Sequence, residues 1–215
     1  FDAPSSGDTT EEVTPPRPEL VESWCDKVSF DSNGRVTSID LGGKNLRKGL
    51  PFQPEEVFGK CFSPHLETLS LAGTDLPVAD IVSIAPFVRS RIEVLHLGGN
   101  ALGPEGAERV AAAWLEPDDA NRLAKLDLRY NDIGGAGTKA ICQALLKKAP
   151  STTSGQSSDG VGVLERLYLE GNGIGDEGCA ALADLLRGNS DGNSNGEEKD
   201  ETGAAASSLR ELFLG

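Results

Sequence analysis

Apolar positions in the middle of the chain recur in one fixed arrangement, which is written three times between Ile92 and Leu186. Each copy follows L-x-x-L-x-L-x-x-N-x-L-G-x-x-G, with Ile replacing Leu at some positions, and the copies begin at Ile92, Leu123 and Leu164. The alternating leucines predict a short strand with both side chains on one face. An apolar pair four residues apart follows each pair of glycines and predicts a helix with one buried face.

The other positions of the frame also have physical tasks. The asparagine side chain can satisfy backbone groups where the chain leaves the strand. The glycines permit a tight turn and a close approach of the helix. One strand–helix unit cannot bury its apolar face alone, so neighbouring units have to stack. The helix pairs expected in the core are Val110 and Trp114, Ile141 and Leu145, and Leu182 and Leu186.

This frame resembles the leucine-rich-repeat family, and its Gly-x-x-Gly-plus-helix ending is similar to ribonuclease-inhibitor-type repeats. The resemblance implies an α/β fold, a leucine-rich-repeat solenoid with a curved parallel sheet inside and helices outside. Repeats start near 36, 66, 92, 123 and 164, and a partial repeat starts at 209. We therefore expect a single leucine-rich-repeat domain over 21–215, preceded by an acidic disordered or extended arm over 1–20.

The segment 21–35 is predicted to cap the solenoid. Trp24-Cys25, together with Leu46 and Leu50-Pro51 of the first repeat, resembles the cap and first repeat of plant receptor-type leucine-rich-repeat proteins. This chain lacks the close cysteine pair of those caps. Asn33-Gly34 lies between short apolar runs and predicts a hairpin, so the cap is expected to contribute an antiparallel strand.

The four cysteines fall into two pairs. Cys25 and Cys61 flank the first repeat and would be bonded in an oxidising compartment, whereas in a reducing one they would stay free. Cys142 and Cys179 occupy small-residue positions on consecutive repeat helices, where we expect buried thiols.

Charge and composition limit the partners. The net charge of −14 argues against nucleic acid or an anionic membrane surface. No apolar run approaches the roughly 20 residues of a transmembrane segment, although peripheral association with a membrane complex stays open. Flexible inserts are expected at 151–160 and 188–207, both on the same edge of the sheet. They are either a binding edge or tolerated loops.

The first residues bear on localisation. The chain starts at Phe1 and contains no Met, which indicates a processed or partial chain. Phe1-Asp2-Ala3-Pro4 resembles the presequence junction of algae with secondary plastids. Our hypothesis is a processed organellar chain of the plastid or its lumen, with cytosolic or secreted chains as alternatives.

Candidate catalytic and cofactor motifs are incomplete or are explained by the repeat. Gly173-x-Gly175-x-x-Gly178 matches a dinucleotide fingerprint, but earlier copies carry the same glycine pair, so we interpret it as a repeat turn. Asp191-x-Asn193-x-Asn195-Gly196 matches half of a calcium loop, and is either a weak calcium site or a solvated linker. His65 and His96 have no nucleophile or carboxylate spaced to serve them, and His96 is expected to be exposed. We expect no enzymatic activity, no cofactor and no metal site.

The open face of the predicted sheet is the candidate binding surface. Side chains between the inward leucines point away from the core, and those of the later repeats are charged and aromatic, as at binding hot spots. The alternative is an idle solvated sheet in which Asp127 pairs with Lys125 or Arg166 across strands. The predicted contact residues are Lys125, Arg129, Tyr130, Arg166, Tyr168 and Phe213.

The resemblance implies a non-enzymatic scaffold for protein–protein interaction. The leading hypothesis is an accessory subunit of a multisubunit, organellar or photosynthetic complex. One alternative is a receptor-type recognition ectodomain, against which the chain lacks any Asn-x-Ser/Thr glycosylation site. Another is a regulator of an enzyme or small GTPase, since ribonuclease inhibitors and activators of the GTPase Ran have similar repeats.

Overall fold

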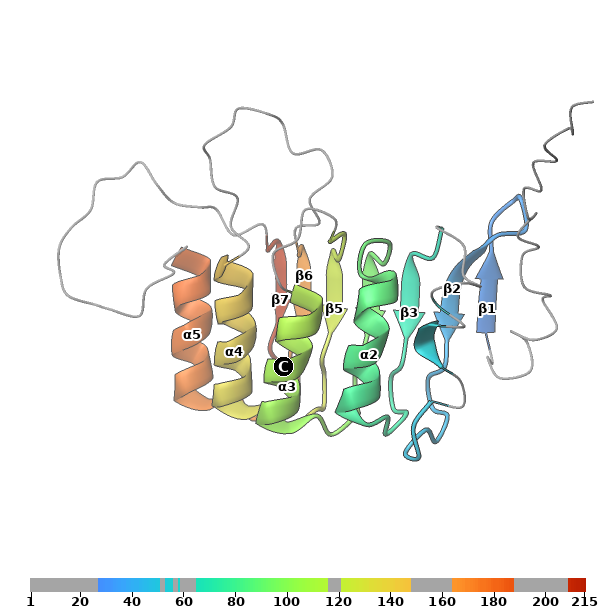
Figure 1. Cartoon of the computed structure of the whole chain (residues 1–215). Helices are drawn as coiled ribbons and strands as arrows, with labels where there is room; N and C mark the ends of the chain where they lie inside the picture. The colour runs from blue at the N-terminus through green and yellow to red at the C-terminus, as the bar shows by residue number, and fades with distance from the viewer. Residues whose placement is uncertain are drawn as a thin grey trace, which may run out of the picture.

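The computed structural model describes residues 27–50, 53–55, 58, 65–115, 121–147, 164–187 and 209–215. These residues form a single sheet that is covered by helices on one side (Figure 1). The strands lie side by side in sequence order. They are β1 (Lys27–Phe30), β2 (Val36–Asp40), β3 (Thr68–Ser70), β4 (Val94–His96), β5 (Lys125–Asp127), β6 (Arg166–Tyr168) and β7 (Glu211–Phe213). The helices are α2 (Val78–Val88), α3 (Gly103–Leu115), α4 (Gly134–Lys147) and α5 (Gly175–Arg187).

The strands from β2 to β7 are parallel and keep one register. Leu95 is the partner of Leu126, and Leu126 is the partner of Leu167. These three leucines have no exposed surface. A slip of one residue would turn every leucine to the solvent, so the buried face specifies the register. The expected α/β solenoid and its aligned repeats are confirmed.

The cap strand β1 pairs antiparallel with β2. The turn between them contains Gly34, whose φ of +75° favours glycine, so the hairpin predicted from Asn33-Gly34 is confirmed. Cys25 and Cys61 lie outside the described residues, as do the arm over 1–20 and the inserts 151–160 and 188–207.

The helices pack against one another on one side of the sheet through small residues (Figure 1). A Cβ atom on Gly137 would lie 3.0 Å from Cβ of Ala107, and one on Gly178 would lie 3.2 Å from Cβ of Thr138. The second glycine of each frame therefore lets its helix cover the preceding one. Ala107 and Thr138 are buried as a result.

Two expectations about α5 are wrong. Cys179 occupies the position equivalent to Thr138, yet it is exposed, because no described helix follows α5 to cover it. Leu186 is 57% exposed, and the buried pair in this helix is Leu182 with Leu185. Each helical residue turns by about 100°, so Leu185 takes the inward direction and Leu186 points past it. Cys142 is buried, as expected.

Candidate protein-binding face

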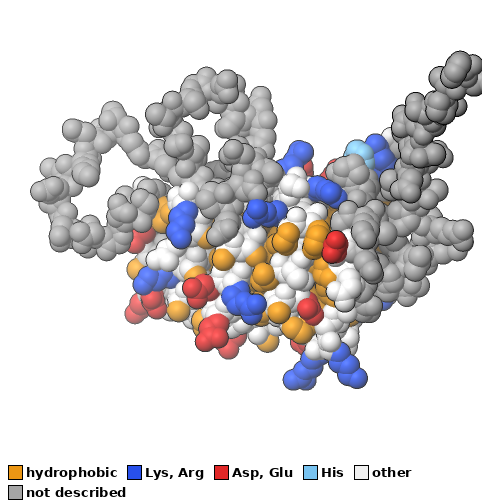
Figure 2. All heavy atoms as spheres, in the orientation of Figure 1, with side chains coloured by type: hydrophobic (Ala, Val, Ile, Leu, Met, Phe, Trp, Pro, Cys, Tyr) orange, Lys and Arg blue, Asp and Glu red, His pale blue; other side chains and the backbone are white. Residues whose placement is uncertain are grey.

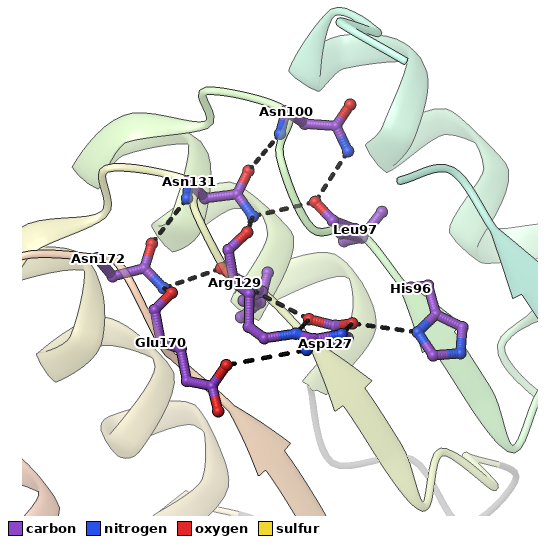
Figure 3. A network of polar contacts seen from close by, with 9 residues as sticks. His96, Leu97, Asn100, Asp127, Arg129, Asn131, Glu170 and Asn172 are labelled. Atoms are coloured by element: carbon purple, nitrogen blue, oxygen red, sulfur yellow. Dashed lines mark hydrogen bonds and ion pairs between the residues drawn. The ribbon is translucent and has the colours of Figure 1, made fainter. Parts of the chain in front are cut away.

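A ladder of asparagines holds the turns that follow the parallel strands (Figure 3). The backbone N–H of Asn100 donates to Oδ1 of Asn131 over 2.9 Å, and that of Asn131 donates to Oδ1 of Asn172 over 2.9 Å. Each side-chain amide also donates to backbone carbonyls of its own repeat and of the preceding one. The expectation that the asparagine satisfies backbone groups where the chain leaves the strand is confirmed. These bonds hold the turn that follows each strand in a fixed position relative to the neighbouring repeat.

Thr74 takes the place of asparagine in the second repeat. Its backbone N–H donates to Oδ1 of Asn100 over 3.0 Å, as in the later rungs, and its Oγ1 hydroxyl donates to the carbonyl of Leu71 over 2.9 Å. Thr74 is fully buried. The ladder therefore continues to β3 although the residue type changes.

The sheet face turned away from the helices, called the concave face below, carries a polar network centred on Asp127 of β5. The side chain of Asp127 is 5% exposed. Arg129 donates to both of its oxygens, over 2.9 Å and 2.7 Å, and Nδ1 of His96 lies 3.3 Å from it (Figure 3). Arg129 also lies 3.8 Å from a carboxylate oxygen of Glu170. The network thus joins β4, β5 and the turn after β6.

The hydrogen bonds of this network set its ionisation. Burial would raise the pKa of Asp127, but the hydrogen bonds from His96 and Arg129 outweigh it and hold that pKa well below its usual range. The hydrogen bond to Asp127 raises the pKa of Arg129, although burial opposes the rise. Both groups are therefore charged at neutral pH, and the arginine is held in place by a bidentate pair.

Two aromatic rings stack beside this network. The ring centres of Tyr168 and Phe213 are 4.5 Å apart, and their planes differ by 1°. Nζ of Lys125 lies 5.1 Å from the centre of the Tyr168 ring, and Cζ of Arg129 lies 5.4 Å from it. Because β6 lies between β5 and β7, Tyr168 stands between two cations and an aromatic ring. Such contacts stabilise an arrangement by about 0.5–1.5 kcal/mol each.

Four of the six predicted contact residues thus form one group around Tyr168, which we call the Tyr168 cluster. Its members are Lys125, Arg129, Tyr168 and Phe213. Arg166 lies beside it, as the register partner of Lys125, and forms an ion pair of 2.9 Å with Glu211.

Tyr130 does not join the Tyr168 cluster. It follows β5 in a turn, where its φ is +55°. Its side chain is 67% exposed. A Cβ atom on Gly171 would overlap the Tyr130 ring, so the ring lies over that glycine of the next repeat.

The predicted partners of Asp127 are also wrong. Lys125 lies over Tyr168 and Arg166 pairs with Glu211, while Asp127 binds Arg129 and His96. His96 is half-buried rather than merely exposed. The Asp127–Arg129 ion pair could have been predicted from the spacing Asp127-x-Arg129, because side chains two residues apart in extended backbone point to the same face.

Ser70, His96 and Asp127 lie opposite one another on β3, β4 and β5. This order resembles a catalytic triad, but among the described residues a hydrogen bond joins only His96 to Asp127, and none joins Ser70 to His96. Within the same ranges, no group of three or more His, Cys, Asp and Glu residues could hold a metal ion.

The opposite side of the molecule is the helical surface, where acidic and basic side chains are interspersed with apolar ones (Figure 2). A shallow groove between α3 and α4 is lined mainly by alanines and contains no aromatic ring. None of the described helices is long and apolar enough to cross a membrane. The concave face is therefore the more distinctive surface of the two.

Fold and face together define a class of protein: a repeat solenoid with helices on one side of a parallel sheet and an open contact face on the other. The family model described as Leucine Rich repeat matches residues 92–111, 123–142 and 163–183. These matches and the parallel sheet support a leucine-rich-repeat protein, a family whose repeats generally mediate protein–protein interaction. No curated protein matches the chain.

Proposed function

We propose that this chain is a non-enzymatic scaffold that binds a protein partner on the concave face at β5–β7, as an accessory subunit of a larger assembly. The proposed contacts are the Tyr168 cluster and Arg166, with Tyr130 at the rim. The Tyr168 cluster is the observation that carries this proposal, because stacked rings flanked by held cations resemble the hot spots of known interfaces.

The ion pairs around the cluster favour a lasting complex. Arg129 is held by Asp127, and Arg166 is held by Glu211. A side chain that is already held loses less conformational entropy on binding, so more of its contact energy appears as affinity. The glycine spacing and the cap sequence support the ribonuclease-inhibitor type of repeat and a plant receptor-type cap as finer subtypes.

Purification of the tagged chain from its natural source, followed by mass spectrometry and native mass measurement, tests this function. A large stoichiometric complex is the expected result. A membrane-linked signalling partner would instead favour the receptor alternative, and a soluble enzyme or small GTPase would favour the regulator alternative. Recovery of the chain alone would contradict all three.

Matched variants then locate the contact. We expect Tyr168→Ala to weaken binding of the recovered partner by about 30-fold, as for a hot-spot residue. Arg166→Ala is compared with Lys139→Ala, because Lys139 has a similar exposure and also forms an ion pair, with Glu177, but lies on the helical side. Unchanged affinity for both concave-face variants would remove this face from consideration.

A further inference from the structure

Lys125 is a cation of the concave face for which the described residues provide no carboxylate partner. Lys125 makes its cation–π contact with Tyr168, and among the described residues no carboxylate lies within ion-pair distance of it. Arg129 and Arg166, by contrast, are neutralised by Asp127 and Glu211. The lysine is half-buried, and it is the charge of Lys125 itself that the carboxylates around the cluster leave unpaired. An incoming carboxylate would neutralise it.

The other end of the cluster presents an aromatic surface. Phe213 is 38% exposed, although one face of its ring is stacked on Tyr168. Glu211 and Glu170 lie near this end of the face, on β7 and in the turn after β6. These carboxylates disfavour an acidic group here, so the ring is suited to an uncharged aromatic side chain.

The distance between the two ends limits the shape of the ligand. Lys125 Nζ and the Phe213 ring lie on opposite sides of Tyr168, at 5.1 Å and 4.5 Å from its ring centre. The cation and the outer ring are therefore about 10 Å apart. In a polyproline II segment, residues i and i+3 share a side and are separated by about 9.3 Å. In a β-strand, residues i and i+3 point to opposite sides, so an extended β-segment fits less well.

We propose that the concave face binds a protein segment in polyproline II conformation that carries an acidic residue and, three residues later or earlier, an aromatic residue. The carboxylate pairs with Lys125, and the aromatic ring packs on Phe213. The segment crosses β5, β6 and β7 with its acidic end at β5. This inference rests on the proposed function and specifies the chemistry of the partner.

Short capped peptides test this chemistry directly. The probe is acetyl-Glu-Pro-Pro-Trp-amide, and the controls replace Glu by Gln or Trp by Ala. Reversed-order peptides (Trp-Pro-Pro-Glu and Trp-Pro-Pro-Gln) test the other chain direction. Binding to the full chain at millimolar peptide and low salt is followed by NMR, through the resonances of Lys125, Tyr168 and Phe213. We expect the Glu peptide to bind about three- to tenfold more tightly than the Gln peptide in at least one order, and the Ala peptide to bind more weakly.

The Lys125→Gln variant and its matched control Lys139→Gln make the test specific. We expect the preference for Glu over Gln to fall to about one in Lys125→Gln and to persist in Lys139→Gln, since Lys139 lies on the helical side. Equal binding of all peptides, no binding at millimolar concentration, or a preference that survives Lys125→Gln would overturn the proposal.

The two proposals fail separately. Loss of native-partner binding in Tyr168→Ala without any peptide preference would leave the scaffold function standing and reject the acidic-aromatic ligand. Specific peptide binding with an unaffected native partner would keep the ligand site and move the native interface elsewhere.

Discussion

Replacing Asn131 by alanine removes one rung of the ladder that joins neighbouring repeats. Its Oδ1 accepts the backbone N–H of Asn100, and its Nδ2 donates to the carbonyls of Leu97 and Leu128. Both carbonyls keep a second donor, from Asn100 and Asn172 respectively. Among the described residues the N–H of Asn100 has no such substitute, so it is left without a partner in a buried turn.

The magnitude follows from these contacts. An orphaned buried N–H costs about 1–3 kcal/mol, and each lost hydrogen bond adds about 0.5–1.5 kcal/mol. We expect Asn131→Ala to lower the free energy of unfolding by about 3 kcal/mol, a large part of the 5–15 kcal/mol typical of folded proteins. The matched control is Asn33→Ala in the exposed hairpin turn, where the backbone N–H bonds to Asp31 and the side chain has no hydrogen-bond partner among the described residues. A change within about 0.5 kcal/mol is expected there.

Urea titration followed by circular dichroism measures the loss of unfolding free energy. The dependence of that free energy on urea concentration is compared between variants, because solenoids do not always unfold in two states. Amide hydrogen exchange supplies the site-specific test. Protection of the Asn100 N–H should fall in Asn131→Ala by more than that of amides in β3. If the free energy changes by less than about 1 kcal/mol and Asn100 stays protected, the orphaned-donor argument is wrong.

Three further predictions use other contacts. The pKa of Asp127 is lower in the folded chain than the unfolded value of about 3.9, so the unfolded chain binds more protons below that pH and stability falls as pH falls. Urea titrations from about pH 7 to pH 3 should therefore show a smaller loss in Asp127→Asn than in the wild type; parallel losses would contradict this linkage. Burial raises the pKa of the Cys142 thiol to about 12, so iodoacetamide should modify exposed Cys179 well before Cys142, as read by peptide mass spectrometry. Gly171→Ala forces an alanine to φ +70° and places its Cβ in the Tyr130 ring, so it should lower the free energy of unfolding by about 2 kcal/mol. In a Tyr130→Ala background the loss should be about 1 kcal/mol, because only the backbone strain is left. Equal losses in the two backgrounds would show that the ring plays no part.

The repeat frame predicts most of this architecture because it records which side chains must avoid water. Period-two leucines specify the inward face of each strand, and stacking requires Leu95, Leu126 and Leu167 to be neighbours. The hairpin at Asn33-Gly34 was predictable for a local reason, since Gly34 needs a positive φ. The exposure of Cys179 was not, because it depends on whether another helix covers α5 rather than on the residues around the cysteine.

The amino-acid order alone is enough to place Lys125 and Asp127 on the same face of one strand, with Arg129 two residues further along, because side-chain direction alternates regardless of neighbours. It does not say which cation the carboxylate binds. Competing surface ion pairs differ by less than about 1 kcal/mol, so the outcome depends on the side-chain positions that the packed neighbours allow. The packing of β6 and β7 beside β5 decides these contacts. Lys125 lies over the Tyr168 ring, Arg129 rather than Lys125 pairs with Asp127, and Tyr168 stacks on Phe213.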